Sequence, residues 1–145
     1  MTRIHTDGAC RGNPGPGGWA WARGRDVFAS GAAAHTTNQR MEIQAVIEAL
    51  RENPDGPLEI VSDSSYVVKC FHERWHAGWL RRGWRNSQGK PVANRDLWEP
   101  LFALTLGVER EVTFSWVKGH SGDPMNDFVD LLATRAADLQ AGEHA

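Results

Sequence analysis

The chain has 145 residues, of which 41% are hydrophobic and 23% charged, and this balance predicts a single domain over residues 1–145. Its longest apolar run is far shorter than the ~20 residues that cross a bilayer, and no apolar leader opens the sequence, so we expect a cytoplasmic monomer without a membrane partner. The net charge of −2 argues against a uniformly basic nucleic-acid binder, although residues 72–95 hold six basic side chains against one acidic one. Cys10 and Cys70 are expected to be reduced thiols.

The first third of the chain is predicted to form three strands. The stretch "TRIHTDGA" (residues 2–9) alternates and ends in Asp-Gly, which predicts a strand that runs into a turn at Asp7. The glycines and prolines of "RGNPGPGG" (11–18) predict a loop. The stretches "WAWARG" (19–24) and "DVFASGAAA" (26–34) then predict a hairpin, so we expect an antiparallel meander.

Helices and strands alternate in the rest of the chain. The stretch "TTNQRMEIQAVIEALREN" (36–53) has helical spacing and stops before Pro54. Two more strands are predicted at 57–63 and 111–120, and three more helices at 64–75, 94–106 and 126–141. Because helical crossovers connect the later strands, these strands should be parallel. We therefore predict an α/β fold, in which helices flank a mixed five-stranded sheet.

Acidic residues occupy the ends of several predicted elements. Asp7 ends the first strand, Glu42 opens the first helix, and Asp63 ends the fourth strand. Each also has a structural interpretation, because Asp7 could be a turn residue and Asp63 a helix N-cap. Glu42 fits a capping box poorly, since no Ser or Thr stands three positions earlier. Carboxylates that converge would repel one another without a cation, and oxygen ligands suit Mg²⁺ or Mn²⁺.

The last helix can supply a fourth carboxylate from either of two aspartates. One apolar stripe would place Asp127 at the rim of the helix, and it consists of Phe128, Leu131, Leu132 and Leu139. A second stripe would place Asp130 there instead, and it consists of Val129, Leu132, Ala133 and Ala136. The smaller residues of the second stripe suit close packing of a helix on a sheet, but helical spacing alone leaves both alternatives open.

Five blocks in order resemble the signature blocks of type I ribonuclease H: "TDGACRGNPGPGGW", "TTNQRMEIQAVIEAL", "SDSSYVV", "RGWRNSQGKPVANRDLW" and "WVKGHSGDPMNDFVDLLA". The resemblance covers nearly the whole chain and implies a ribonuclease H-like fold. It also implies an endonuclease that cuts the RNA strand of an RNA–DNA hybrid with two Mg²⁺ ions, for which Mn²⁺ could substitute. The products would carry 5′-phosphate and 3′-hydroxyl ends.

The same resemblance implies the roles of individual residues. It assigns metal binding and catalysis to four carboxylates and a proton-transfer or product-release role to His120; the carboxylates are Asp7, Glu42, Asp63 and Asp130. The family spacing places the last aspartate ten residues after the histidine, and so favours Asp130 over Asp127. Asp127 then becomes an acidic neighbour near the helix N-terminus. Asp123 becomes a loop residue before a proline.

Substrate binding is expected along three segments, with Asn126 as a further contact. For the 2′-hydroxyl-bearing strand the residues are Gly8, Cys10, Asn13 and Gln39. For the DNA strand or its phosphate they are Asn38, Thr37 and Arg40, of which Thr37 or Asn38 could instead simply cap a helix. A basic protrusion at about 72–95 should grip the DNA backbone through Trp75, Trp79, Arg81, Arg82, Trp84 and Arg85. These tryptophans could also be core residues, and Ser65 stands where the family often has glutamine.

Two other functions compete with hybrid cleavage. One is a hybrid-binding module with weak or lost catalysis, which would have no reason to keep four unpaired acids. The other is a DNA-directed nuclease of the same fold, against which the blocks that would read the 2′-hydroxyl argue.

Overall fold

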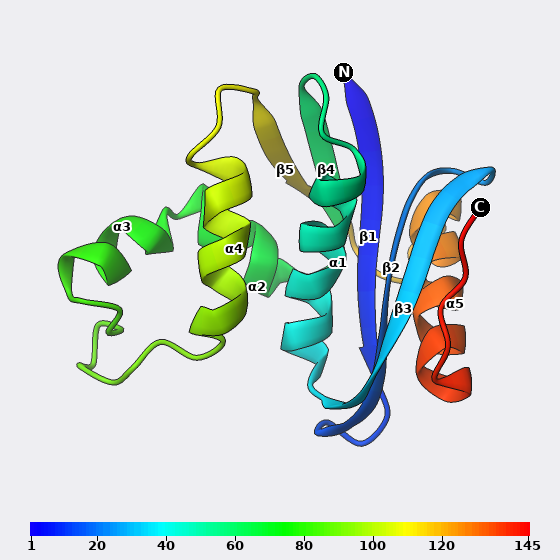
Figure 1. Ribbon diagram of the computed structural model, residues 1–145, viewed down its shortest axis with the longest axis horizontal. Coiled ribbons are helices and arrows are strands. Elements are labelled where there is room, and N and C mark those ends of the chain that lie inside the picture. Colours follow the sequence, from blue (N-terminus) through cyan, green and yellow to red (C-terminus); the bar gives the residue numbers. More distant parts are fainter.

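The computed structural model describes residues 1–145 and contains five strands and five helices (Figure 1). The strands are β1 (Thr2–Cys10), β2 (Gly15–Gly24), β3 (Val27–Thr36), β4 (Leu58–Ser62) and β5 (Val112–Trp116). The helices are α1 (Asn38–Glu52), α2 (Ser65–His72), α3 (Trp75–Arg81), α4 (Arg95–Thr105) and α5 (Pro124–Leu139). None of these helices has the length and apolar character that a membrane span requires.

The strands form one mixed sheet in the order β3-β2-β1-β4-β5. β2 pairs antiparallel with both β1 and β3, whereas β4 pairs parallel with both β1 and β5. The predicted mixed α/β sheet is therefore confirmed, including the antiparallel meander and the parallel later strands. β1 is the central strand, and the parallel pairing brings its carboxyl-terminal half beside the end of β4.

Helices cover both faces of the sheet (Figure 1). α5 lies alone on one face, where Val129, Leu132 and Ala133 pack against the small side chains Ala20 and Ala22 of β2. α1, α2 and α4 lie on the other face, over the larger hydrophobic core, whose fully buried members include Ile4, Ile43, Ile60, Trp98 and Leu101. α3 extends away from this layer at the side of the molecule.

The strands run further than the sequence predicts, because several glycines serve close packing and not turns. Asp7 lies inside β1, opposite Ala20, and not at the start of a turn. A Cβ atom on Gly8 would approach the backbone nitrogen of Glu42 to 2.5 Å, so the Asp-Gly pair lets β1 pack closely against α1. A Cβ atom on Gly18 would lie 2.3 Å from the carbonyl oxygen of Ala133 in α5. The predicted loop 11–18 therefore gives way to strand β2 at Gly15.

Three helices connect β4 to β5, where the sequence predicts two. The additional helix, α3, has seven residues, too few to show a helical repeat in the sequence. Its Trp79 is 9% exposed and lies 5.6 Å, centroid to centroid, from Trp98 in α4. Tertiary packing of the tryptophan therefore stabilises a helix that local sequence spacing does not predict.

Helix caps define the roles of two of the aspartates. The Ser64 side chain caps α2 and accepts from the backbone nitrogen of Val67 at 3.2 Å, which leaves the neighbouring Asp63 free. Asp123 is the N-cap of α5 and not a loop residue. Of the two candidate caps of α1, Thr37 makes the bond, accepting from the backbone nitrogen of Arg40.

Candidate active site

Carboxylates from three separate elements meet at one edge of the sheet. Oxygen atoms of Asp7 in β1, Glu42 in α1 and Asp63 just beyond β4 lie within 4.8 Å of one another. The parallel register explains the first and third of these, because Thr6 is opposite Ser62 and the residues that follow are the two aspartates. The structure thus brings together three of the carboxylates that the sequence singled out, from positions far apart in the chain.

The fourth carboxylate, Asp130, comes from α5 on the opposite face of the sheet. The second of the two apolar stripes is the buried one, since Val129, Leu132 and Ala133 are each 0% exposed. This phase leaves Asp130 half-buried and close enough to Asp7 to influence its pKa, while Asp127 is exposed. The helix phase that the sequence left open is therefore the one that turns Asp130 toward the cluster.

Burial and mutual repulsion hold these acids in an unusual protonation state. Asp7 is 5% exposed, and its burial, followed by the charges of Asp63 and Asp130, raises its pKa to about 9. Burial also raises the pKa of Glu42 to about 7, although the Ser64 hydroxyl donates to Glu42 Oε2 at 2.6 Å and opposes the rise. Without a cation, this site cannot ionise fully at neutral pH.

The donor set suits a hard divalent cation. All the groups are carboxylate oxygens from different elements, with no Cys or His among the clustered ligands, which is the chemistry of Mg²⁺ or Mn²⁺ sites and not of zinc sites. Burial is the main influence that raises the pKa of Asp7 and of Glu42, and a bound cation would oppose that rise by favouring the ionised carboxylates. The residues present therefore fit the predicted metal.

The loop between β5 and α5 closes over Asp63. A Cβ atom on Gly119 would lie 2.9 Å from Asp63 Oδ2, so a larger residue here would displace that carboxylate. Burial raises the pKa of Asp63. The residue after Gly119, His120, is exposed, adopts a left-handed backbone with φ of 56°, and lies near enough for its charge to oppose that rise. Asn126 is buried in the first turn of α5, and hydrogen bonding by its side chain also opposes the rise in the pKa of Asp63.

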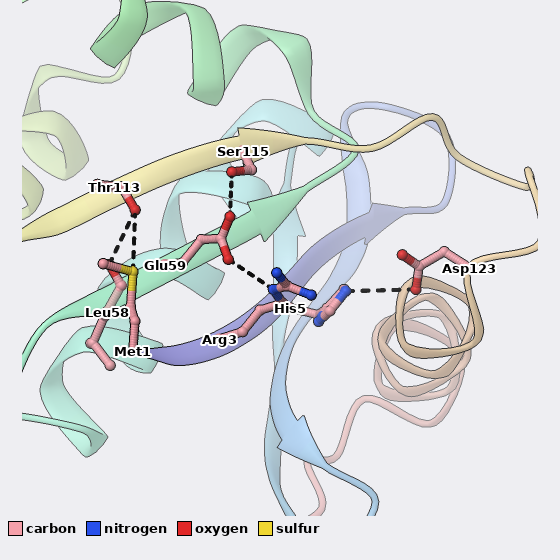
Figure 2. Close-up of polar contacts among 8 residues, drawn as sticks. All are labelled: Met1, Arg3, His5, Leu58, Glu59, Thr113, Ser115 and Asp123. Atoms are coloured by element: carbon pink, nitrogen blue, oxygen red, sulfur yellow. Dashed lines mark hydrogen bonds and ion pairs between the residues drawn. The ribbon is translucent and has the colours of Figure 1, made fainter.

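A buried histidine that the sequence analysis did not single out anchors the start of α5 (Figure 2). His5 is 6% exposed, and its Nε2 faces Asp123 Oδ1 at 3.6 Å. Burial, the largest influence, lowers the pKa of His5. On the same strand, Arg3 binds Glu59, which also accepts from Ser115 at 2.6 Å. The alternation of β1 places His5 on the α5 face, but only the packing of α5 reveals its partner.

The residues expected near the RNA and DNA strands cluster around the 11–14 loop and the N-terminus of α1. Asn13 Oδ1 accepts from the backbone nitrogen of Asn38 at 2.9 Å, which joins the loop to the helix. Cys10 Sγ points back to the carbonyl oxygens of Gly15 and Thr36, and neither Cys10 nor Cys70 forms a disulfide. Thr37 is partly exposed, and Asn38 and Gln39 are fully exposed. This surface lies beside Gly8 and Glu42.

The predicted protrusion contains one residue that belongs to the core. Trp79 packs among other aromatic rings, so the expectation that its ring lies on the binding surface is wrong. Trp75 and Trp84 are half-buried against the same core. The three arginines of this segment that were predicted to bind DNA remain exposed and could reach a polyanion; they are Arg81, Arg82 and Arg85.

Comparison with known proteins agrees with this geometry. The sequence profile of the RNase H family matches residues 1–138. The chain is 49% identical to a ribonuclease H of Xanthomonas campestris, over 96% of this chain and 93% of that protein. It is also 49% identical to a ribonuclease H of Thermus thermophilus, over 95% of this chain and 84% of that protein.

Solved structures agree as well. LC9-RNase H1, a type 1 RNase H with the type 2 active-site motif, superposes with a TM-score of 0.80 at 28% identity, over 99% of this chain and 76% of that one. LC11-RNase H1, solved in complex with an RNA/DNA hybrid, shares the fold with a TM-score of 0.70 at 21% identity, over 94% of this chain and 96% of that one. The chain therefore belongs to the ribonuclease H family, as its type I sequence blocks indicated.

Proposed function

We propose that the protein is an endonuclease that hydrolyses the RNA strand of RNA–DNA hybrids and leaves 5′-phosphate and 3′-hydroxyl ends. The observation that carries the proposal is the convergence of Asp7, Glu42 and Asp63 within 4.8 Å, in a chain of the ribonuclease H family. LC11-RNase H1, which shares the fold, was solved in complex with an RNA/DNA hybrid, and this supports the same substrate class for the present chain.

Four carboxylates would hold two Mg²⁺ ions, or Mn²⁺ in their place; they are Asp7, Glu42, Asp63 and Asp130. Two such ions supply an activated water and charge stabilisation at the leaving oxygen when bound. The Ser64 hydroxyl orients Glu42, because it donates to one carboxylate oxygen and leaves the other free. Asn126 orients Asp63 in a similar way.

His120 would move a proton at the reacting edge of the site. Its imidazole is exposed, lies beside Asp63, and stands on the loop between β5 and α5. An imidazole can both give and accept a proton. We assign it the protonation of the leaving group or the release of the product.

The substrate would lie across the N-terminus of α1 and the protrusion. The RNA strand would pass Gly8, Cys10, Asn13 and Gln39, while the DNA phosphate would meet the helix N-terminus at Thr37 and Asn38. The exposed arginines of the protrusion would meet the DNA backbone beside Trp75 and Trp84. Trp79 would support this surface from below, since it is part of the core.

Hybrid cleavage is the direct test. The protein should cut the RNA strand of a hybrid with Mg²⁺ and stop when EDTA is added, while an RNA duplex and a DNA duplex remain intact. The variant Asp7→Asn should bind the hybrid but not cut it, because the most buried ligand is lost. Turnover retained in Asp7→Asn would overturn the metal-site assignment. Binding without any cleavage by the unaltered chain would indicate a hybrid-binding module, and cleavage of the DNA duplex would indicate a DNA-directed nuclease.

A further inference from the structure

A groove lies beside Asp63, between α2 and the end of β5. Its cavity volume is about 370 Å³, near the lower end of ligand-pocket sizes, and its lining is mainly apolar. Four of its lining residues come from α2 and one from the end of β5: Ser65, Val68, Lys69, His72 and Trp116. None of these residues has a role in the function proposed above.

Trp116 links the groove to the active site. Trp116 is 52% exposed, and its Nε1 donates to the backbone carbonyl oxygen of Asp63 at 3.1 Å. A single exposed aromatic residue needs no explanation by itself. Here, however, the hydrogen bond to Asp63 fixes the orientation of the indole. The exposed apolar face of Trp116 therefore stays at a constant distance from the candidate active site.

Lys69 supplies a positive charge at the same groove. It is exposed on α2 and forms no ion pair in the structure. An unpaired ammonium group above an apolar wall suits a ligand with one anionic group and one flat or weakly polar face. The bases of a duplex are stacked inside it, so its sugar–phosphate edge is the part that can reach such a groove.

We propose that this groove is a subsite for one ribose-phosphate unit of the RNA strand next to the scissile phosphate. The ribose packs on the Trp116 indole and the phosphate pairs with Lys69. The RNA strand is the occupant because two of the lining residues adjoin Asp63, where the strand to be cut must lie: Trp116 bonds to its carbonyl oxygen, and Ser65 follows it by two residues. Under the proposed function the DNA strand meets the protrusion instead. This subsite rests on the proposed function, and it extends the substrate contact to a surface on α2 and β5.

The test combines a charge-removing substitution with charge-removing substrates. Hybrids that each carry a single neutral methylphosphonate at a different position of the RNA strand are bound to the full-length chain in Ca²⁺, and Kd is measured. In the unaltered protein, neutralising the phosphate at the subsite should weaken binding roughly two- to five-fold, as expected for an exposed ion pair. In Lys69→Gln the same neutralisation should cost nothing further, while every other position keeps its effect. The log–log salt slope of Lys69→Gln should fall by about 1.

Arg23→Gln is the matched control, because it removes one exposed positive charge at the opposite end of the sheet. It should leave Kd, the salt slope and the methylphosphonate pattern unchanged. Trp116→Phe keeps an apolar ring but removes the bond to Asp63, and should lower kcat more than it raises KM. The subsite is refuted if Lys69→Gln binds like the unaltered protein, or if its loss is the same at every methylphosphonate position. Hybrid cleavage by the unaltered chain is scored separately, so failure of the subsite is distinguishable from failure of the proposed function.

Discussion

Asp123 offers a quantitative test of how α5 is anchored, because its carboxylate serves two partners. Asp123 Oδ1 accepts from the backbone nitrogens of Met125 and Asn126, each at 3.0 Å, and faces His5 Nε2 at 3.6 Å. The substitution Asp123→Ala removes both interactions. α5 carries Asn126 and Asp130, so its first turn positions part of the candidate active site.

The expected loss of stability follows from the cap. Removing an aspartate N-cap costs about 1 kcal/mol, within a range of roughly 0.5–2. The His5 contact adds little at neutral pH, because burial lowers the pKa of His5 and keeps the ring uncharged. We therefore expect a loss of about 1–1.5 kcal/mol, and a Tm lower by about 3–6 °C for a chain of this size.

Thermal unfolding of three variants measures this loss. Asp123→Asn keeps the capping oxygen and should melt close to the unaltered protein. Asp127→Ala is the matched control, since Asp127 is exposed in the same turn and only its favourable interaction with the helix dipole is lost, about 0.3–1 kcal/mol. A Tm for Asp123→Ala within 1 °C of the unaltered protein would refute the cap, and so would an equal loss in Asp123→Asn.

The difference in stability between the unaltered protein and Asp123→Ala should depend on pH with a definite sign. Hydrogen bonding by the Asn126 backbone is the main influence that lowers the pKa of Asp123. A lowered carboxyl pKa contributes stability that is complete above the unfolded-state pKa and is lost as the pH falls through the folded-state pKa. The gap between the unaltered protein and Asp123→Ala should therefore persist at pH 5 and shrink only in strong acid. A gap that vanished by pH 5 would contradict this assignment.

Three further predictions concern the site. Asp130→Asn should lower kcat for hybrid cleavage by at least about 100-fold and Asp127→Asn by less than about threefold, because only Asp130 faces the buried cluster and one catalytic charged group is typically worth about 10²–10⁴-fold. The reverse order would mean that the phase of α5 is wrong. The folded-state pKa is raised to about 7 for Glu42 and to about 9 for Asp7, so their contribution to stability is lost as the pH rises through these values. The rise in Tm that Mg²⁺ causes should therefore be larger at pH 9 than at pH 6, and an equal rise at both would contradict the buried cluster. Three exposed arginines of the protrusion can be neutralised together, namely Arg81, Arg82 and Arg85. Hybrid binding should weaken, and the slope of log Kd against log salt concentration should fall by up to about 3. An unchanged slope would mean that the segment does not contact phosphate.

Most of the architecture could be predicted from local sequence. The alternating stretches, the helical spacing after Thr37 and the placement of helices between the later strands were enough for the mixed sheet. The error at Gly8 and Gly18 arose because glycine has two uses, in turns and in close packing, and only the neighbouring helix distinguishes them. The missed α3 arose because seven residues are too short for a periodic signal.

In the candidate site, too, local sequence predicted some residues correctly and missed or misplaced others. The residue types and their positions at the ends of predicted elements already indicated acidic ligands, and the parallel pairing of β1 with β4 made their convergence a consequence of the fold. Residues without a chemical signature were missed or misplaced. His5 reads as one polar residue in an alternating strand, and Trp79 reads as part of a basic surface, until the packing of α5 and α4 is known.

The sequence by itself determined the fold class, the family and the identity of the acids that could bind a metal, because these depend on spacing and residue type along the chain. The tertiary structure decided which side chains face one another. It oriented Asp130 rather than Asp127 toward the cluster. It also made Asp123 the N-cap of α5, facing His5, and fixed the exposed Trp116 beside Asp63. The physical reason is that helix phase, burial and pKa depend on contacts between distant segments, and local propensity contains no information on those contacts.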